Sequence, residues 1–292
     1  MAQTQMKDPT NVIDDRLGCI DYDESGHGPT IVFVPGSCST GAAWRPVIAA
    51  LAGRFRCVTT SLPGYGGTAE RRTPIDPPMA REVEIVEEVV RRAAGPGNDP
   101  IHLVGHSFGG LVGLAVALRG QARLASLVIA EAPAPSVLRA YGEIEHYRAF
   151  RDMTDRYFAA FQRGEPEAIA VMIDFYGGRG TFASWPPRVR DYVVATTPVN
   201  ILDWTSAYGY LLPPVGLLAL EIPVHVVCGG DSHPAVRRAN ELLSIHLRDA
   251  SFGVLKRAAH FMIATHAAEL ADIVARHVGR QIAHPMPAPL IY

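Results

Sequence analysis

Short apolar segments alternate with longer helix-like segments along most of this 292-residue chain, and this alternation does most to restrict its fold. Each apolar segment contains Val and spans only four or five residues. Segments of this kind are typical of parallel strands buried on both faces of a sheet. We predict six such strands, at residues 30–34, 57–60, 101–104, 126–130, 224–228 and 251–255.

The segments between these strands have helical character. One of them, residues 79–94, carries acidic residues early and Arg91-Arg92 late, which suits the dipole of a helix. Residues 17–22 alternate in polarity near the start of the chain and predict an antiparallel edge strand. Alternating strands and helices predict a three-layer α/β fold with a mostly parallel central sheet. The other helices are expected at residues 108–118, 236–246 and 267–278.

Residues 135–214 break the alternation. They are mostly helical in pattern and hold more than half of the aromatic residues of the chain. An insertion of this length between two strands predicts a helical lid, or cap, on a core formed by residues 1–134 and 215–292. Trp185, Phe175 and Tyr176 are our candidates for lining an apolar substrate pocket beneath the lid, although such residues also form a lid's own core.

The most informative segment is residues 103–110, Leu-Val-Gly-His-Ser-Phe-Gly-Gly. It is an apolar strand, then Gly-x-Ser-x-Gly, then a helix rich in small residues. The turn is so tight that only small residues fit two positions before and after the serine, hence Gly105 and Gly109. It lifts the hydroxyl of Ser107 out of the sheet, near the positive end of the following helix. Ser107 is therefore the candidate catalytic nucleophile.

With residues 34–37 (Val-Pro-Gly-Ser), 62–66 (Leu-Pro-Gly-Tyr-Gly), 105–109 and the late Ala259-His260, the chain resembles the α/β-hydrolase family over nearly its whole length. The similarity is to the lid-bearing members that are esterase-like or haloalkane-dehalogenase-like. It implies the α/β-hydrolase fold and a Ser-His-acid triad.

The resemblance also implies roles for three further residues. The general base lies on the loop after the last strand, which maps to His260. The backbone N–H groups of Phe108 and Ser37 map to the oxyanion hole, which stabilises the negative charge of the transition state. The chain departs from the family at Pro35-Gly36, where His-Gly is usual. The backbone N–H of Ser37 does not depend on that His. The hydrogen bonds that hold the loop, however, do not follow from the resemblance.

Two carboxylates compete for the role of orienting the base. Asp231 follows the strand at 224–228, where many family members carry their acid after a Gly-x-x spacing. Counted from Gly229, however, that position holds Ser232. Glu131 ends the preceding strand, where some members carry the acid instead, and a buried carboxylate there would need a partner. We favour Glu131 and keep Asp231 as the alternative.

A serine nucleophile attacks a carbonyl and forms an acyl-enzyme that water then cleaves. We therefore expect a serine hydrolase acting on a carboxylic ester, lactone or thioester of a small apolar or aromatic substrate. Alternatives are hydrolysis of a carbon–carbon bond or a cofactor-free lyase or transferase reaction on the same triad. A non-catalytic ligand-binding protein on a hydrolase scaffold is a further alternative.

The composition of the chain argues against several classes of partner and cofactor. The net charge of −2 provides no basic surface for nucleic acid, and no apolar run is long enough to span a membrane. The four cysteines form no Cys-x-x-Cys pair or metal-ligand cluster, and the acyl-enzyme chemistry implies no organic cofactor, so we expect no metal and no cofactor. Residues 1–11 lack an apolar signal segment and residues 284–289 are rich in proline. We expect a cytoplasmic enzyme, either a monomer or a homo-oligomer, with a small-molecule substrate and no membrane or nucleic-acid partner.

Overall fold

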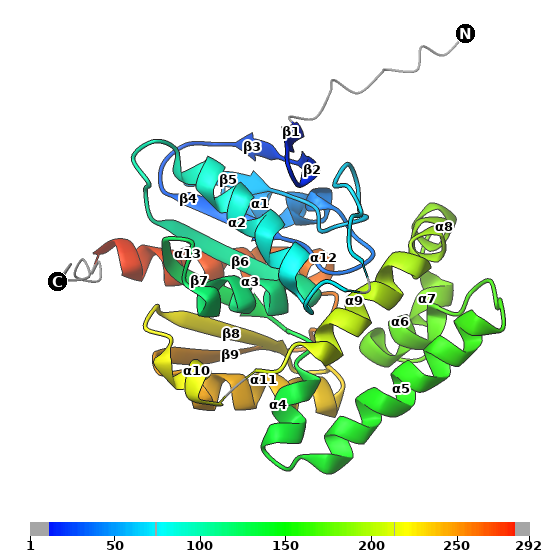
Figure 1. The fold of residues 1–292 in the computed structure, drawn as a ribbon. Helices are drawn as coiled ribbons and strands as arrows, with labels where there is room; N and C mark the ends of the chain where they lie inside the picture. The colour runs from blue at the N-terminus through cyan, green and yellow to red at the C-terminus, as the bar shows by residue number, and fades with distance from the viewer. Residues whose placement is uncertain (1–11, 74, 213, 284–292) are drawn as a thin grey trace, which may run out of the picture.

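A computed structural model describes residues 12–73, 75–212 and 214–283. The expectations for residues 1–11 and 284–289 lie outside these ranges. The main sheet has seven strands in the order β3-β5-β4-β6-β7-β8-β9, and all neighbours are parallel except the pair β3 and β5 (Figure 1). Its strands are β3 (Asp23–Ser25), β4 (Thr30–Val34), β5 (Arg56–Thr59), β6 (Ile101–His106), β7 (Leu124–Ala130), β8 (Val224–Gly229) and β9 (Ala250–Leu255).

All six predicted strands are present in the sheet. The antiparallel strand predicted at residues 17–22 also forms, but it does not lie at the edge of the main sheet. Residues Gly18–Asp21 form β2, which pairs with β1 (Val12–Asp15) in a separate two-stranded sheet. The antiparallel edge of the main sheet is β3 instead. Alternating polarity indicates a strand with one buried face, but it does not indicate which strand will pair with it.

Helices cover both faces of the sheet (Figure 1). One face packs on α1 (Arg45–Ala50) and α13 (Ala267–Ala283), and the other packs on α2 (Ala80–Ala94), α3 (Phe108–Arg119) and α11 (Pro234–His246). Side chains of one strand alternate between the two layers: Ile31 and Phe33 of β4 join the first, Val32 and Val34 the second. This two-sided burial explains why the strand segments are continuously apolar, and it confirms the three-layer α/β fold.

Between β7 and β8 the chain forms a series of helices. They are α4 (Pro135–Ala140), α5 (Ile144–Gln162), α6 (Ala170–Gly177), α7 (Thr181–Ser184), α8 (Pro187–Ala195), α9 (Thr197–Gly209) and α10 (Pro214–Ala219). Helices α5 to α9 gather beyond one end of the sheet, whereas α10 lies beside α11 (Figure 1). Two short helices complete the described elements, η1 (Gly41–Trp44) and α12 (Met262–Thr265). In the described residues, no helix combines the length and the apolar character needed to cross a bilayer.

Candidate active site

Ser107 lies in a sharp turn between β6 and α3. Its backbone has φ 53° and ψ −128°, a conformation that side-chain-bearing residues rarely adopt, and its N–H donates to the carbonyl of Ala130 on the next strand. A Cβ atom added to Gly105 would lie 2.3 Å from the carbonyl oxygen of Gly109. A Cβ atom on Gly109 would lie 2.3 Å from the carbonyl oxygen of Pro35. Both glycines are thus required for the turn that raises the Ser107 hydroxyl above the sheet.

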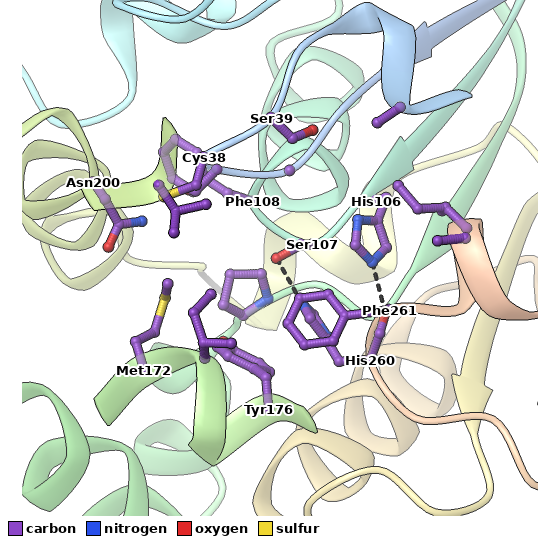
Figure 2. Close-up of a pocket in the computed structure, with 18 of the residues that line it drawn as sticks. Cys38, Ser39, His106, Ser107, Phe108, Met172, Tyr176, Asn200, His260 and Phe261 are labelled. Carbon is purple, nitrogen blue, oxygen red and sulfur yellow. Dashed lines mark hydrogen bonds between the residues drawn. The ribbon is translucent and has the colours of Figure 1, made fainter. Parts of the chain in front are cut away.

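The imidazole of His260 lies next to that hydroxyl. His260 follows β9 along the chain, and its Nε2 is 2.9 Å from Ser107 Oγ (Figure 2). Tyr176 of α6 stacks on the His260 ring with 4.0 Å between centroids. His106 Nε2 lies 2.8 Å from the His260 carbonyl oxygen. Burial lowers the pKa of His106 to about 3, so this ring is neutral and donates to that carbonyl. These contacts hold one face of the His260 ring and the backbone of the same residue.

Glu131 contacts the other side of the base. Its Oε2 lies 2.8 Å from His260 Nδ1, and the side chain is fully buried. Its Oε1 accepts hydrogen bonds from the backbone N–H of Gly229, at 2.6 Å, and from the hydroxyl of Ser232. Burial alone would raise the pKa of Glu131, but the hydrogen bonds from His260, Ser232 and Gly229 outweigh it and hold the pKa below its usual range. An ionised Glu131 keeps the proton of His260 on Nδ1, which leaves Nε2 free to accept the serine proton.

The competing acid, Asp231, lies elsewhere. Its side chain is exposed, and among the hydrogen bonds of the described residues none joins its carboxylate to His260. Its backbone N–H donates to the carbonyl of Ala258. Ser232 occupies the position that the Gly-x-x spacing reserves for an acid, and its hydroxyl serves Glu131 instead. The arrangement therefore favours Glu131.

The two predicted oxyanion residues flank the nucleophile. Phe108 is the first residue of α3, where backbone N–H groups have no acceptor within the helix. Ser37 follows β4, and its hydroxyl donates to Asp203 Oδ2 at 2.5 Å. A Cβ atom on Gly36 would lie 2.8 Å from the Cβ of Ser107, so this loop passes directly beside the nucleophile. Both residues line the same cavity as Ser107.

That cavity has a volume of about 380 Å³ and lies between the sheet and the inserted helices. Trp185 and Tyr176, two of the predicted pocket residues, line it. The prediction for Phe175 is wrong: it is not among the lining residues and instead stacks on His233 with 4.1 Å between centroids. The cause is helical geometry: Met172, Ile173 and Tyr176 mark the side of α6 that lines the cavity, and at about 3.6 residues per turn position 175 lies almost opposite Ile173, outside this stripe.

A buried charge network that no sequence pattern indicated connects α9 to the core. Asp203 is 1% exposed, and its Oδ1 accepts from Arg72 Nη1 at 2.6 Å. Its Oδ2 accepts from the hydroxyls of Ser37 and Tyr65, the latter at 2.6 Å. Burial raises the pKa of Asp203 to about 6, even though Arg72 and the two hydroxyls stabilise the ionised form. Arg72 also pairs with Glu82 at 3.0 Å and with Glu70.

Within the described residues, no group of three or more His, Cys, Asp or Glu side chains is arranged to hold a metal ion.

The model of the family described as "Alpha/beta hydrolase family" matches residues 31–273. A curated relative, the pimeloyl-[acyl-carrier protein] methyl ester esterase of Aeromonas hydrophila, is 27% identical over 89% of this chain and 99% of its own length. Among solved structures, a hydrolase from Pseudomonas aeruginosa is 19% identical with a TM-score of 0.72, covering 93% of this chain and all of its own. Est816, titled an N-acyl homoserine lactone degrading enzyme, is 17% identical with a TM-score of 0.70, covering 91% of this chain and 99% of its own. With a fold, a nucleophile turn and a family match that agree, this chain belongs to the α/β-hydrolase family.

Proposed function

We propose that this protein is a serine hydrolase that cleaves a carboxylic ester of a small, mostly apolar substrate through an acyl-enzyme. The supporting observation is the hydrogen-bonded chain from Ser107 through His260 to Glu131, with Ser107 and His260 on the wall of one cavity. The relative from Aeromonas hydrophila is named a methyl ester esterase, which favours an ester over other acyl substrates.

The reaction begins when Ser107 Oγ attacks the ester carbonyl and its proton passes to His260 Nε2. The Oγ–C bond forms, and the carbonyl electron pair moves onto the oxygen, toward the backbone N–H groups of Phe108 and Ser37. Glu131 stabilises the imidazolium that results, without taking its proton. The intermediate then collapses, the C–O bond to the alcohol breaks, and His260 returns its proton to the leaving oxygen. An acyl group now esterifies Ser107.

Water completes the cycle. His260 accepts a proton from a water molecule, whose oxygen attacks the acyl carbon, and a second tetrahedral intermediate forms in the same oxyanion hole. Its collapse releases the carboxylic acid and restores the Ser107 hydroxyl. One ester and one water thus give one acid and one alcohol.

The test is a panel of 4-nitrophenyl esters from acetate to decanoate, assayed with the wild type, Ser107→Ala and Ser244→Ala. Ser244 is the matched control because its hydroxyl donates to the carbonyl of Glu241 on α11, away from the cavity. We expect turnover by the wild type and Ser244→Ala and none above background by Ser107→Ala. Equal rates for all three proteins would refute the proposal. Incorporation of ¹⁸O from labelled water into the acid separates hydrolysis from acyl transfer.

A further inference from the structure

Three buried polar atoms on the cavity wall have no hydrogen-bond partner among the described residues. They are the hydroxyl oxygens of Ser39 and Tyr176 and the amide nitrogen of Asn200. An unpaired donor that is removed from water costs free energy, so it is retained where something else supplies the acceptor. The catalytic steps above use none of these three atoms.

Asn200 is the most restricted of the three. It is 1% exposed, and its Oδ1 accepts from the hydroxyl of Tyr157 at 2.9 Å. Burial raises the pKa of Tyr157 well above its usual value, so that hydroxyl keeps its proton and donates it to the amide. The contact fixes the orientation of the amide group and turns Nδ2 toward the side of the cavity where Ser107 lies (Figure 2). Asn200 thus presents N–H donors to the cavity and no acceptor.

The side chains beside Asn200 on α9 leave its Nδ2 without a competing acceptor. Asn200, Asp203, Trp204 and Ala207 form the stripe of α9 that faces the cavity. Both oxygens of Asp203 are already occupied by Arg72, Ser37 and Tyr65, so this carboxylate does not compete for Nδ2.

The charge of the wall also matters. The described residues that line the cavity include no Lys or Arg, and Asp203 is an acid. A substrate carboxylate would therefore meet no free cation there, and burying it would be costly. An uncharged oxygen, which accepts a hydrogen bond without carrying a charge, suits this wall.

Resting on the ester hydrolysis proposed above, we propose that Asn200 determines specificity by donating a hydrogen bond from Nδ2 to an uncharged oxygen of the substrate, separate from the ester group that reacts. The favoured substrates are then esters whose apolar body carries a keto, hydroxyl or ether oxygen, rather than plain alkyl esters. A plain alkyl ester leaves the donor buried and unpaired, and sites built to hydrogen-bond a polar group discriminate against analogues that lack it.

The test compares 4-nitrophenyl octanoate with the four isomeric keto-octanoate esters that carry a keto group at carbon 4, 5, 6 or 7 of the acyl chain, with spontaneous hydrolysis subtracted. For the wild type, we expect at least one keto ester to exceed the octanoate in kcat/KM by 10-fold or more. In Asn200→Leu the same ratio should fall to near 1. Thr205→Val is the control, because Thr205 lies on the same helix, is exposed, and its hydroxyl donates to the carbonyl of Ile201; it should keep the wild-type ratio.

A wild-type ratio near 1 for all four isomers, or an unchanged ratio in Asn200→Leu, would overturn the inference. Should Asn200→Leu fail to fold, Asn200→Ala replaces it with a side chain too small to clash.

A binding measurement separates this inference from the proposed function. Ser107→Ala is titrated with methyl octanoate and the matching methyl keto-octanoates, and quenching of Trp185 and Trp204, which line the cavity, reports binding. Tighter binding of a keto ester, lost in the double variant Ser107→Ala/Asn200→Leu, supports the subsite even if the wild type hydrolyses no ester. Equal affinities throughout would count against the subsite even if ester hydrolysis is observed.

Discussion

Replacing Glu131 by Gln should nearly abolish turnover while leaving the fold intact. The reason is that the hydrogen-bond donors around residue 131 determine the orientation of the new amide group. Glu131 Oε1 accepts from the backbone N–H of Gly229 and from the Ser232 hydroxyl. If the amide nitrogen of Gln took that position, it would face the Gly229 N–H donor at about the same short distance of 2.6 Å. The amide oxygen is therefore expected at the Oε1 position and the amide nitrogen beside His260.

That orientation reverses the hydrogen bonding of the base. An amide N–H directed at His260 Nδ1 requires Nδ1 to accept, so the ring proton moves to Nε2. Nε2 then donates toward Ser107 and no longer accepts its proton. In a serine protease the comparable carboxylate-to-amide change lowers kcat by about 10⁴-fold. We expect a fall of roughly 10³- to 10⁴-fold here, about 4–5.5 kcal/mol in activation free energy.

Steady-state kinetics on the best aryl ester measure the effect, and circular dichroism establishes that Glu131→Gln remains folded. Asp231→Asn is the matched control because Asp231 is exposed and, among the described residues, its carboxylate makes no hydrogen bond to His260; its kcat should stay within about 2-fold of the wild type. A folded Glu131→Gln with more than a tenth of wild-type kcat, or a larger loss in Asp231→Asn, would refute the reasoning.

Three further changes test buried features of the site and of the fold. Asp203→Asn removes one buried charge that pairs with Arg72, while Glu70 and Glu82 remain as its partners. Because a buried ion pair is broken, the free energy of unfolding measured in urea should fall by about 3 kcal/mol, and no fall would contradict the network. Gly105→Ala places a Cβ atom against a backbone oxygen 2.3 Å away and should yield no folded protein or cost roughly 4 kcal/mol or more, whereas Gly279→Ala, with open space around it, should be tolerated. Burial lowers the pKa of His277 from 6.5 to about 4, and repulsion from His225 adds to this effect. Because His277 then takes up its proton at a higher pH in the unfolded chain than in the folded one, the free energy of unfolding falls as the pH drops from about 6.5 to about 4. His277→Leu should remove up to about 3 kcal/mol of that pH dependence; an unchanged profile of unfolding free energy against pH would contradict it.

Much of the fold follows from the sequence because burial on both faces leaves a direct pattern. Each of the six apolar runs forms a strand of the main sheet, since a parallel strand between two helical layers needs apolar side chains in both directions. The sheet to which residues Gly18–Asp21 belong is not predictable in this way, because polarity along one strand carries no information about its neighbour.

The active site likewise combines features that the sequence predicts with features that only the structure distinguishes. The turn at Ser107 is predictable because steric restrictions appear directly as glycines two residues away on either side. The preference for Glu131 over Asp231 could only be argued, since the two strand ends lie at the same edge of the sheet. The hydrogen bonds at Oε1 and Oε2 distinguish them in the structure.

The lid was the least predictable part. Phe175 was expected in the cavity, yet helix phase turns it away, and aromatic composition does not carry that phase. Asp203 and Asn200 gave no signal as isolated polar residues in a helical stretch, because their partners lie far away in the sequence. Arg72 is 131 residues from Asp203, and Tyr157 is 43 residues from Asn200.

The central claim is that Ser107 is a nucleophile activated by His260, and covalent labelling tests it most directly. The wild type, Ser107→Ala and His260→Asn are incubated with a fluorophosphonate, and intact mass with peptide mapping locates the adduct. The account predicts one adduct per chain on Ser107 in the wild type, none in Ser107→Ala, and labelling slowed by at least about 100-fold in His260→Asn. An unlabelled wild type, or an adduct that persists when Ser107 is replaced, would contradict it.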